Sequence, residues 1–194
     1  DSDYLATLCR DDVTLVTDPI ARLDAGGIVT EAGHHDLDVI VFATGFEIYD
    51  MTWPARVAGP GGQTMEEAIG DSPRAWLGMM VAGFPNAFSI LGPNTGLGHN
   101  SVILMSEAQI DHIVRLIKAA EGAGMKRIDV RKDVMEAYNE DLQARLQRRV
   151  WVKGGCASWY QFSDGSIRSL WPDSVVAWQR TLRRVDLSDY VDAR

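Results

Sequence analysis

The residues of this chain that are best suited to chemistry form a glycine-rich loop, residues 92–101, with the sequence GPNTGLGHNS. The apolar run 88–91 before the loop predicts a short buried strand, and the pattern after it predicts a helix from about residue 101 to 120. A strand, a glycine-rich turn and a helix start bring unpaired backbone N–H groups and the positive end of a helix dipole to one place. That place suits a phosphate or another electron-rich ligand group. The alternative, which spacing alone favours, is a structural loop whose glycines serve only the turn.

His99 is the titratable side chain of this loop. Imidazole titrates near neutral pH, so His99 is a candidate to pass a proton to or from a bound ligand. The alternative, and the commoner situation, is a histidine that only hydrogen-bonds its own loop. The catalytic residues otherwise stay unassigned.

Metal and thiol chemistry are not predicted. His34, His35 and His112 have no metal-ligand spacing to carboxylates or cysteines, so no metal site is proposed. Cys9 and Cys156 lie far apart and form no CxxC pair. Neither a disulfide framework nor a thiol redox motif is therefore indicated.

The elements that must position such a site include the apolar segment 36–46, DLDVIVFATGF. Residues 39–42 are β-branched or aromatic without interruption, which predicts a strand buried on both faces, as in a parallel sheet. Gly45 removes the side chain where the backbone then turns, so that a ligand or another segment can come close. Thr44 and Gly45 are thus candidates for contact with a dinucleotide, and the alternative is a strand end packed for reasons of fold.

The rest of the pattern predicts a mixed α/β chain. Residues 13–42 are expected to form a short antiparallel set, with strands at 13–16, 21–23 and 28–30 and a hairpin turn at Ala25-Gly26-Gly27. The long helix at 101–120 is expected to bury the face that carries its β-branched residues, namely Ile103, Ile110, Ile113, Val114 and Ile117. Further elements are predicted as helices at 65–69, 133–149 and 175–182 and a strand at 126–130.

Composition narrows the class of protein. The 194 residues are 46% apolar and 24% charged, which is ordinary for a globular protein, and the net charge is −8. A chain of this charge is repelled by nucleic acid and by anionic membranes, so neither is expected as a partner. No stretch reaches the length of a membrane span, and the first residues lack the basic and apolar regions of a signal peptide, so a cytoplasmic location is expected.

Several motifs occur in a fixed order along the chain: Ala43-Thr44-Gly45, Gly83-Phe84-Pro85-Asn86, the loop 92–101, Ser158-Trp159-Tyr160 and Leu170-Trp171-Pro172. This set resembles the C-terminal part of the class B flavin monooxygenases, the family of the flavin-containing and Baeyer-Villiger monooxygenases. The resemblance implies FAD and NADPH as cofactors. It also implies a partial fold of two dinucleotide-binding domains, with residues 1–46 as the end of the NADPH domain and 47–194 as the second segment of the FAD domain, its helices packed on an incomplete sheet.

The resemblance also assigns site residues. In the family, the helix after the loop has its N-terminus near the flavin ring, which implies flavin contacts for Asn94, Thr95, Leu97 and Asn100. The segment after Trp151 corresponds to a part of the family that runs close to the nicotinamide cofactor and the substrate entrance, which implies pocket roles for Trp159 and Tyr160. The alternative for the C-terminal tryptophans is that they form the core of a region poor in aliphatic residues.

Other family motifs do not occur in this sequence, namely GxGxxG and FxGxxxHxxxW. The chain is therefore expected to be a C-terminal fragment of a monooxygenase that uses NADPH and O₂ to oxidise a ketone or a heteroatom in a small organic substrate. The fragment alone is expected to be inactive and to self-associate through an exposed sheet edge. The alternatives are a non-catalytic α/β ligand-binding or interaction module and a relative of the flavin or disulfide reductases, which the missing cysteine pair disfavours.

Overall fold

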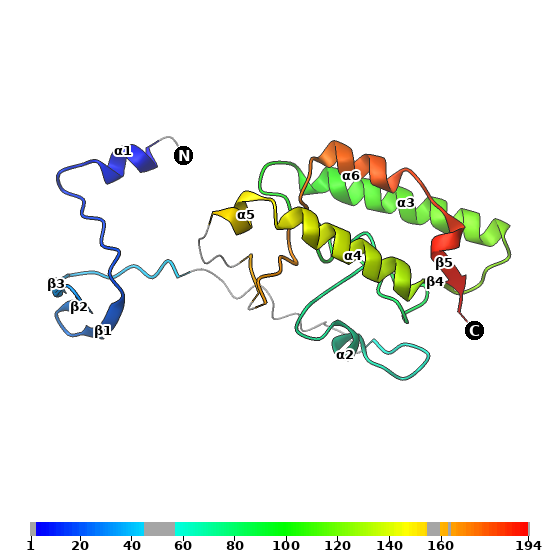
Figure 1. Cartoon of the computed structure of the whole chain (residues 1–194), viewed down its shortest axis with the longest axis horizontal. Helices are drawn as coiled ribbons and strands as arrows, with labels where there is room; N and C mark the ends of the chain where they lie inside the picture. The colour runs from blue at the N-terminus through cyan, green and yellow to red at the C-terminus, as the bar shows by residue number, and fades with distance from the viewer. Residues whose placement is uncertain (1–2, 45–56, 155–159, 163, 194) are drawn as a thin grey trace. The chain divides into compact units, whose positions relative to one another are not determined.

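The computed structural model describes residues 3–44, 57–154, 160–162 and 164–193. The chain divides into two compact units, Asp1–Gly45 (unit 1) and Phe46–Arg194 (unit 2). Unit 1 is drawn in blue shades in Figure 1, and unit 2 runs from cyan to red. The chain is a mixed α/β protein, and the assignment of its parts to an NADPH domain and an FAD domain stays a prediction.

Unit 1 contains a short helix and a three-stranded antiparallel sheet. Helix α1 spans Tyr4–Leu8, and the strands are β1 (Ile20–Asp24), β2 (Gly27–Thr30) and β3 (His34–Asp36), in the order β1-β2-β3. Asp24 pairs with Gly27 across the turn, so the predicted hairpin is confirmed. The predicted strand at 13–16 is wrong, because these residues form no strand, and β3 was not predicted.

The expected buried strand at 39–42 is also wrong for this structure. The segment is not a strand, and three of its four side chains are exposed, with Val39 at 75% and Val41 at 83%. A strand inside a parallel sheet needs hydrogen-bonded neighbours on both sides. Among the described residues, no strand pairs with this segment. Thr44 is exposed as well, and Gly45 lies outside the described residues.

The regular secondary structure of unit 2 is mainly helical. Its elements are α2 (Met65–Ile69), α3 (Val102–Gly122), β4 (Ile128–Val130), α4 (Lys132–Leu146), α5 (Val150–Lys153), α6 (Val175–Leu182), a 3₁₀ turn (Leu187–Asp189) and β5 (Tyr190–Asp192). Strands β4 and β5 form an antiparallel pair, and α6 lies beside α3 (Figure 1). The predicted helices at 65–69 and 175–182 are confirmed, and those at 101–120 and 133–149 and the strand at 126–130 are confirmed with small shifts of their ends.

Local signals explain why these helices begin and end where they do. Thr64 and Glu67 form a capping box at the start of α2, and the Ser174 side chain accepts a hydrogen bond from Ala177 N–H at the start of α6. Gly124, with a φ of 74°, follows the end of α3. Sequence neighbours alone provide these interactions.

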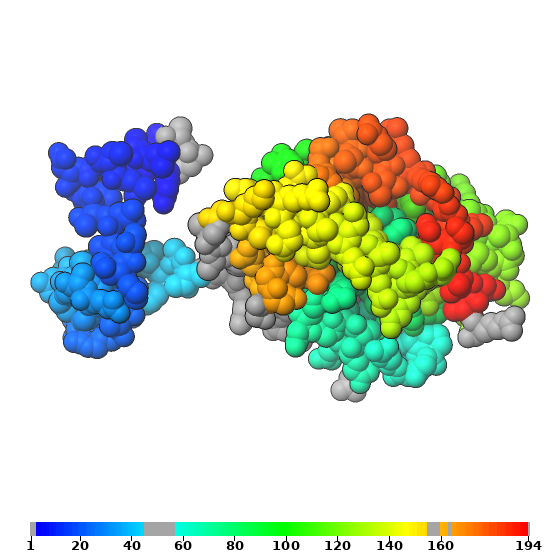
Figure 2. Space-filling view, viewed as in Figure 1, coloured from blue at the N-terminus to red at the C-terminus, as the bar shows by residue number. Residues whose placement is uncertain are grey.

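The core of unit 2 lies between α3, α4 and α6. Leu116, Leu142 and Trp178 have no exposed surface. Trp178 donates from Nε1 to the Met105 carbonyl oxygen (3.2 Å) and meets the Trp171 ring edge-to-face at 4.8 Å between centroids. For Trp171 and Trp178, the alternative that the tryptophans form a core is therefore confirmed. Figure 2 shows α4 in yellow and α6 in orange on one face of unit 2.

The buried face of α3 differs from the predicted one. Met105, Gln109, His112, Leu116 and Ala120 are buried, whereas Ile103, Ile110, Val114 and Ile117 are exposed and only Ile113, of the predicted set, packs against the core. The prediction followed the β-branched residues. The face of α3 that packs into the core instead carries two polar side chains, Gln109 and His112. They can be buried because segments remote in the sequence supply their hydrogen-bond partners.

The predicted buried strand at 88–91 is absent too. The segment forms no strand, and Ile90 and Leu91 are about four-tenths exposed, at 43% and 40%. Leu91 has a φ of 56°, in the left-handed region that a strand cannot include. The segment does form a backbone hydrogen bond of the kind found between strands, from Ser89 N–H to the Met79 carbonyl oxygen (2.9 Å).

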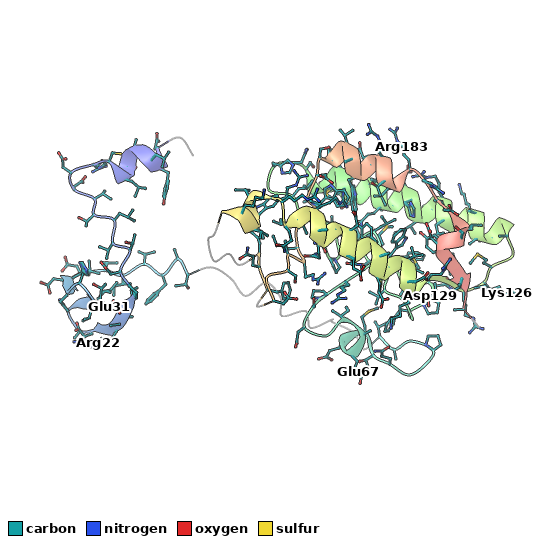
Figure 3. All side chains as sticks on the ribbon, in the orientation of Figure 1. Arg22, Glu31, Glu67, Lys126, Asp129 and Arg183 are labelled. Carbon is teal, nitrogen blue, oxygen red and sulfur yellow. The ribbon has the colours of Figure 1, made fainter. Side chains whose placement is uncertain are left out.

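The turn 83–86 is fastened to β4. Gly83 N–H donates to the Asp129 carboxylate, with an N···Oδ2 distance of 3.0 Å, and Asn86 exchanges hydrogen bonds with Ile128 through its side-chain oxygen (2.8 Å) and its backbone N–H (2.8 Å). Burial raises the pKa of Asp129, which the backbone N–H groups partly offset. Figure 3 labels Asp129, the central residue of β4, and Arg183, which directly follows α6 and is exposed.

A buried polar chain joins α3 to the C-terminal segment. Trp76 Nε1–H donates to the Tyr190 hydroxyl oxygen (3.0 Å), and that hydroxyl lies 3.2 Å from Nε2 of His112. Nδ1 of His112 lies 2.8 Å from the Leu182 carbonyl oxygen, to which it must donate. Neutral His112, with Nε2 as acceptor, satisfies every one of these contacts. Burial is the main cause that lowers its pKa, and the charge of Arg115 lowers it further.

This histidine gives unit 2 an acid-sensitive stability. The unfolded chain binds a proton at His112 near its ordinary pKa of 6.5, whereas the folded chain does so only at lower pH. The stability that neutral His112 contributes is therefore complete above pH 6.5 and is lost as the pH falls through the folded pKa. Over this range the free energy of unfolding changes by up to about 1.4 kcal/mol per pH unit. We expect His112→Gln to remove this slope in the range from pH 6.5 down to the folded pKa. Urea denaturation of both proteins across that range measures it, and parallel pH profiles would contradict the assignment.

Candidate functional site

The glycine-rich loop forms one wall of a cavity in unit 2. The cavity has a volume of about 440 Å³, within the usual range for small-molecule sites. Its other walls come from Pro73, Tyr160 and the segment 168–170, and the first residue of α3 closes one side. The lining is mostly apolar and comprises Pro73, Leu91, Gly92, Pro93, Thr95, Gly96, Leu97, Gly98, Val102, Tyr160, Arg168, Ser169 and Leu170.

Backbone hydrogen bonds fasten the loop to the segment opposite. Gly96 N–H donates to the Ser169 carbonyl oxygen (2.7 Å), and Trp171 N–H donates back to the Gly96 carbonyl oxygen (2.8 Å), which makes a short parallel bridge. Asn94 N–H donates to the Arg168 carbonyl oxygen (2.7 Å). The two walls of the cavity are therefore held at a fixed spacing by main-chain bonds.

Asn94 supports the loop from behind. Its side chain is buried, and Nδ2 donates to the carbonyl oxygens of Ile167 (2.8 Å) and Leu170 (3.0 Å). Its φ of 59° lies in the left-handed region, which asparagine tolerates better than most residues. The side chain predicted to contact flavin is not among the cavity-lining residues and instead holds the loop in its turn.

Gln109 of α3 performs a similar task and was not predicted. Its Oε1 accepts from Leu91 N–H (2.9 Å), and its Nε2 donates to the carbonyl oxygens of Leu77 (3.1 Å) and Gly78 (3.3 Å). Leu91 and Leu77 both have positive φ values, 56° and 51°, which are costly for leucine. The buried amide therefore satisfies the backbone of two strained turns beside the cavity.

The remaining predicted site residues fall into three groups. Thr95, Leu97 and Tyr160 line the cavity. His99 and Asn100 are exposed and do not line it. Thr44 belongs to unit 1, and Gly45 and Trp159 lie outside the described residues.

The N-terminus of α3 faces this region. Val102, its first residue, lines the cavity, and the Ser101 side chain makes no capping hydrogen bond. The first N–H groups of a helix lack intrahelical partners and carry the positive end of its dipole. An electron-rich group bound near Val102 would be stabilised by them.

Gly98 is an exposed residue of the cavity lining. A Cβ atom built on it would meet no atom within 4 Å, so no intramolecular contact requires glycine there. Together with the apolar lining, this open space suits a flat ring system. The glycine motif that holds a pyrophosphate does not occur in the sequence.

Two other kinds of site are not found in the described part of the chain. Its residues hold no group of three or more His, Cys, Asp or Glu side chains that is able to bind a metal ion. No helix there is long and apolar enough to cross a membrane.

Sequence comparison identifies relatives. No family model matches the chain. The FAD-binding monooxygenase ktnD of Aspergillus niger is 39% identical over 193 residues, covering 97% of this chain and 32% of the relative. A Baeyer-Villiger monooxygenase of Pseudomonas aeruginosa is 37% identical over 190 residues, covering 97% of this chain and 36% of the relative. The chain thus spans about a third of the length of these relatives.

Solved structures give the same result. An oxidised steroid monooxygenase bound to NADP aligns with a TM-score of 0.70 and 28% identity, over 98% of this chain and 37% of that one. A cyclohexanone-bound cyclohexanone monooxygenase aligns with a TM-score of 0.66 and 26% identity, over 94% of this chain and 34% of that one.

The chain belongs to the class B flavin monooxygenase family and matches about a third of its full-length members. Within this family it is related to the FAD- and NADPH-dependent Baeyer-Villiger monooxygenases. The family resemblance of the ordered motifs is therefore confirmed.

Proposed function

We propose that this chain forms part of the ring-binding wall in an FAD- and NADPH-dependent monooxygenase, which transfers one atom of O₂ to a ketone or to a heteroatom of a small organic substrate. The observation that carries the proposal is the apolar cavity of about 440 Å³ between the glycine-rich loop and the segment 168–170. Its relatives include an FAD-binding monooxygenase and Baeyer-Villiger monooxygenases. The choice between a ketone and a heteroatom substrate stays open.

FAD, when bound, would supply the redox chemistry and the reaction with O₂. The part of this chain is to bind and orient. Thr95, Leu97 and Val102 offer an apolar surface against a flat ring and keep water from it, and the free N–H groups of α3 favour negative charge nearby. Asn94 and Gln109 hold the loop that carries these groups. Thr44 and Gly45 remain predicted dinucleotide contacts, and His99 remains a candidate proton relay.

Flavin binding by the purified chain tests the proposal. Riboflavin fluorescence should be quenched on titration with the chain, and Gly98→Leu should weaken binding by about tenfold or more, because its side chain occupies the open space in the cavity. Gly61→Leu is the matched control, since Gly61 also has no atom within 4 Å of a built Cβ and does not line the cavity. Equal binding by both variants, or no binding by the unmodified chain, would contradict the cofactor role and leave the non-catalytic module as the better account.

The chain by itself is proposed to have no monooxygenase activity. It spans about a third of the length of its relatives and carries no pyrophosphate-binding glycine motif. With NADPH, FAD, O₂ and cyclohexanone added, we expect no NADPH oxidation coupled to product. Stoichiometric product formation by the isolated chain would overturn this part of the proposal.

Self-association stays a prediction, and the structure offers a surface for it besides a sheet edge. Ile103, Ile110 and Val114 lie on one exposed side of α3, 62%, 52% and 44% exposed. Exposed apolar patches of this kind favour association with a second copy. We expect light scattering to give a mass above that of a monomer, and Ile110→Lys to lower it. Glu107→Gln changes the charge equally without removing apolar surface, so it should leave the mass unchanged; a monomeric parent chain would refute the prediction.

A further inference from the structure

Arg168 is an unusual residue for the wall of an apolar cavity. Only 6% of its surface is exposed, and it was not among the predicted site residues. Its backbone carbonyl oxygen holds Asn94, while its side chain donates from Nε to Ser166 Oγ (3.1 Å). A guanidinium has five N–H donors and stays charged in proteins. Most of its hydrogen-bonding capacity therefore has no protein acceptor among the described residues.

The charges around Arg168 do not neutralise it. Within the described residues no carboxylate forms an ion pair with Arg168. Burial is the main cause that lowers the pKa of Arg168. The charge of Arg74 lowers this pKa further, and the charge of Asp164 raises it. Arg74 is exposed, follows the cavity-lining Pro73, and carries the same charge as Arg168. The Asp164 carboxylate accepts a hydrogen bond from Ser166 N–H at Oδ1 (2.8 Å) and forms no ion pair with Arg168. A buried cation that forms no ion pair is costly unless a ligand supplies the partner charge.

We propose that Arg168, assisted by Arg74, forms an anion subsite in this cavity, and that its ligand is a small molecule with an apolar body and a carboxylate. The mostly apolar lining accommodates the body. The planar guanidinium fork matches a carboxylate with two parallel hydrogen bonds. If this ligand is the substrate, the substrate class is an acidic ketone or an acidic heteroatom compound. Only this last step rests on the proposed function.

Calorimetric titration of the 194-residue chain tests the subsite with two nearly isosteric probes, cyclohexanecarboxylate and neutral cyclohexanecarboxamide. The carboxylate should bind about tenfold or more tightly, as expected for a hydrogen-bonded charge in a buried site. Arg168→Gln should abolish that preference, and Arg168→Lys should keep part of it. Arg183→Gln is the control. Arg183 is exposed and lies outside the cavity, and this substitution removes the same charge as Arg168→Gln. Equal affinity for the two probes, or a preference that survives in Arg168→Gln, would overturn the proposal.

Two further measurements cover the remaining outcomes. If circular dichroism shows that Arg168→Gln does not fold, Arg74→Gln takes its place, with an expected loss of about threefold in carboxylate affinity and none in carboxamide affinity. Inorganic phosphate distinguishes a cofactor phosphate from a substrate carboxylate, and phosphate that displaces the carboxylate at equal concentration would overturn the carboxylate assignment. Riboflavin binding is measured separately, without the carboxylate probe. A chain that prefers the carboxylate but binds no flavin would retain the subsite and refute the cofactor role, and the reverse result would refute the subsite alone.

Discussion

Replacing Trp178 by alanine is expected to lower the free energy of unfolding by about 4 kcal/mol. The side chain has no exposed surface, packs edge-to-face on Trp171 at 4.8 Å, and donates a hydrogen bond to Met105 of α3 (3.2 Å). Its removal leaves a large void between α3 and α6 that the surrounding helices cannot fill. Since domains of this size are stable by only about 5–15 kcal/mol, this single change removes a large part of the total. Urea denaturation followed by far-ultraviolet circular dichroism measures it.

Two variants on the same helix make this result specific. Val176→Ala shortens a side chain that is 57% exposed, and should change the stability by less than about 0.5 kcal/mol. Trp178→Phe keeps an aromatic ring but loses the hydrogen bond to α3. Its loss in the free energy of unfolding should lie between those of Val176→Ala and Trp178→Ala. If Val176→Ala and Trp178→Ala destabilise the chain equally, the assigned buried face of α6 is wrong.

Gly78→Ala has the second large expected effect, because this glycine touches the loop that forms the cavity. Its φ is 60°, and a built Cβ would lie 2.3 Å from Thr95 Cγ2 and 2.9 Å from the Pro93 carbonyl oxygen. The left-handed conformation costs alanine about 1–2 kcal/mol. Displacing the loop adds about 1–3 kcal/mol. We expect a total loss of about 3 kcal/mol in the free energy of unfolding, together with weaker ligand binding in the cavity.

Gly62→Ala separates these two causes. Gly62 also has a positive φ, 81°, but a built Cβ there meets no atom within 4 Å. It should lose only the conformational part, about 1 kcal/mol, and leave ligand binding unchanged. Equal losses in the two variants would show that contact between Gly78 and the loop does not position the cavity wall.

Several elements could be predicted from the sequence because their signals are local. The helices at 65–69 and 175–182 begin at the side-chain caps of Thr64 and Ser174, and α3 ends before Gly124. The hairpin at Asp24 and Gly27 follows from its glycine turn. Strands at 39–42 and 88–91 were predicted from apolar runs alone and are absent, because an apolar run gives no information about the neighbour with which a strand must pair.

The same contrast between local and long-range signals holds for the cavity. Its loop was recognised in the sequence, because glycines between a short apolar run and a helix are a local pattern, and Thr95, Leu97 and Tyr160 are found in the cavity wall. Arg168 was not recognised, because its charge gives no sign of the burial that segments far away in the sequence impose.

The sequence by itself determined where α2, α3, α4 and α6 lie, which glycine-rich loop precedes α3, and which family the ordered motifs resemble. Only the tertiary structure decided which side of α3 faces the core. Gln109 and His112 are buried there because Leu77, Gly78 and Leu182, 31 to 70 residues away, accept their hydrogen bonds. Hydrophobic periodicity describes one helix at a time, whereas burial depends on the partners that the folded chain brings to it.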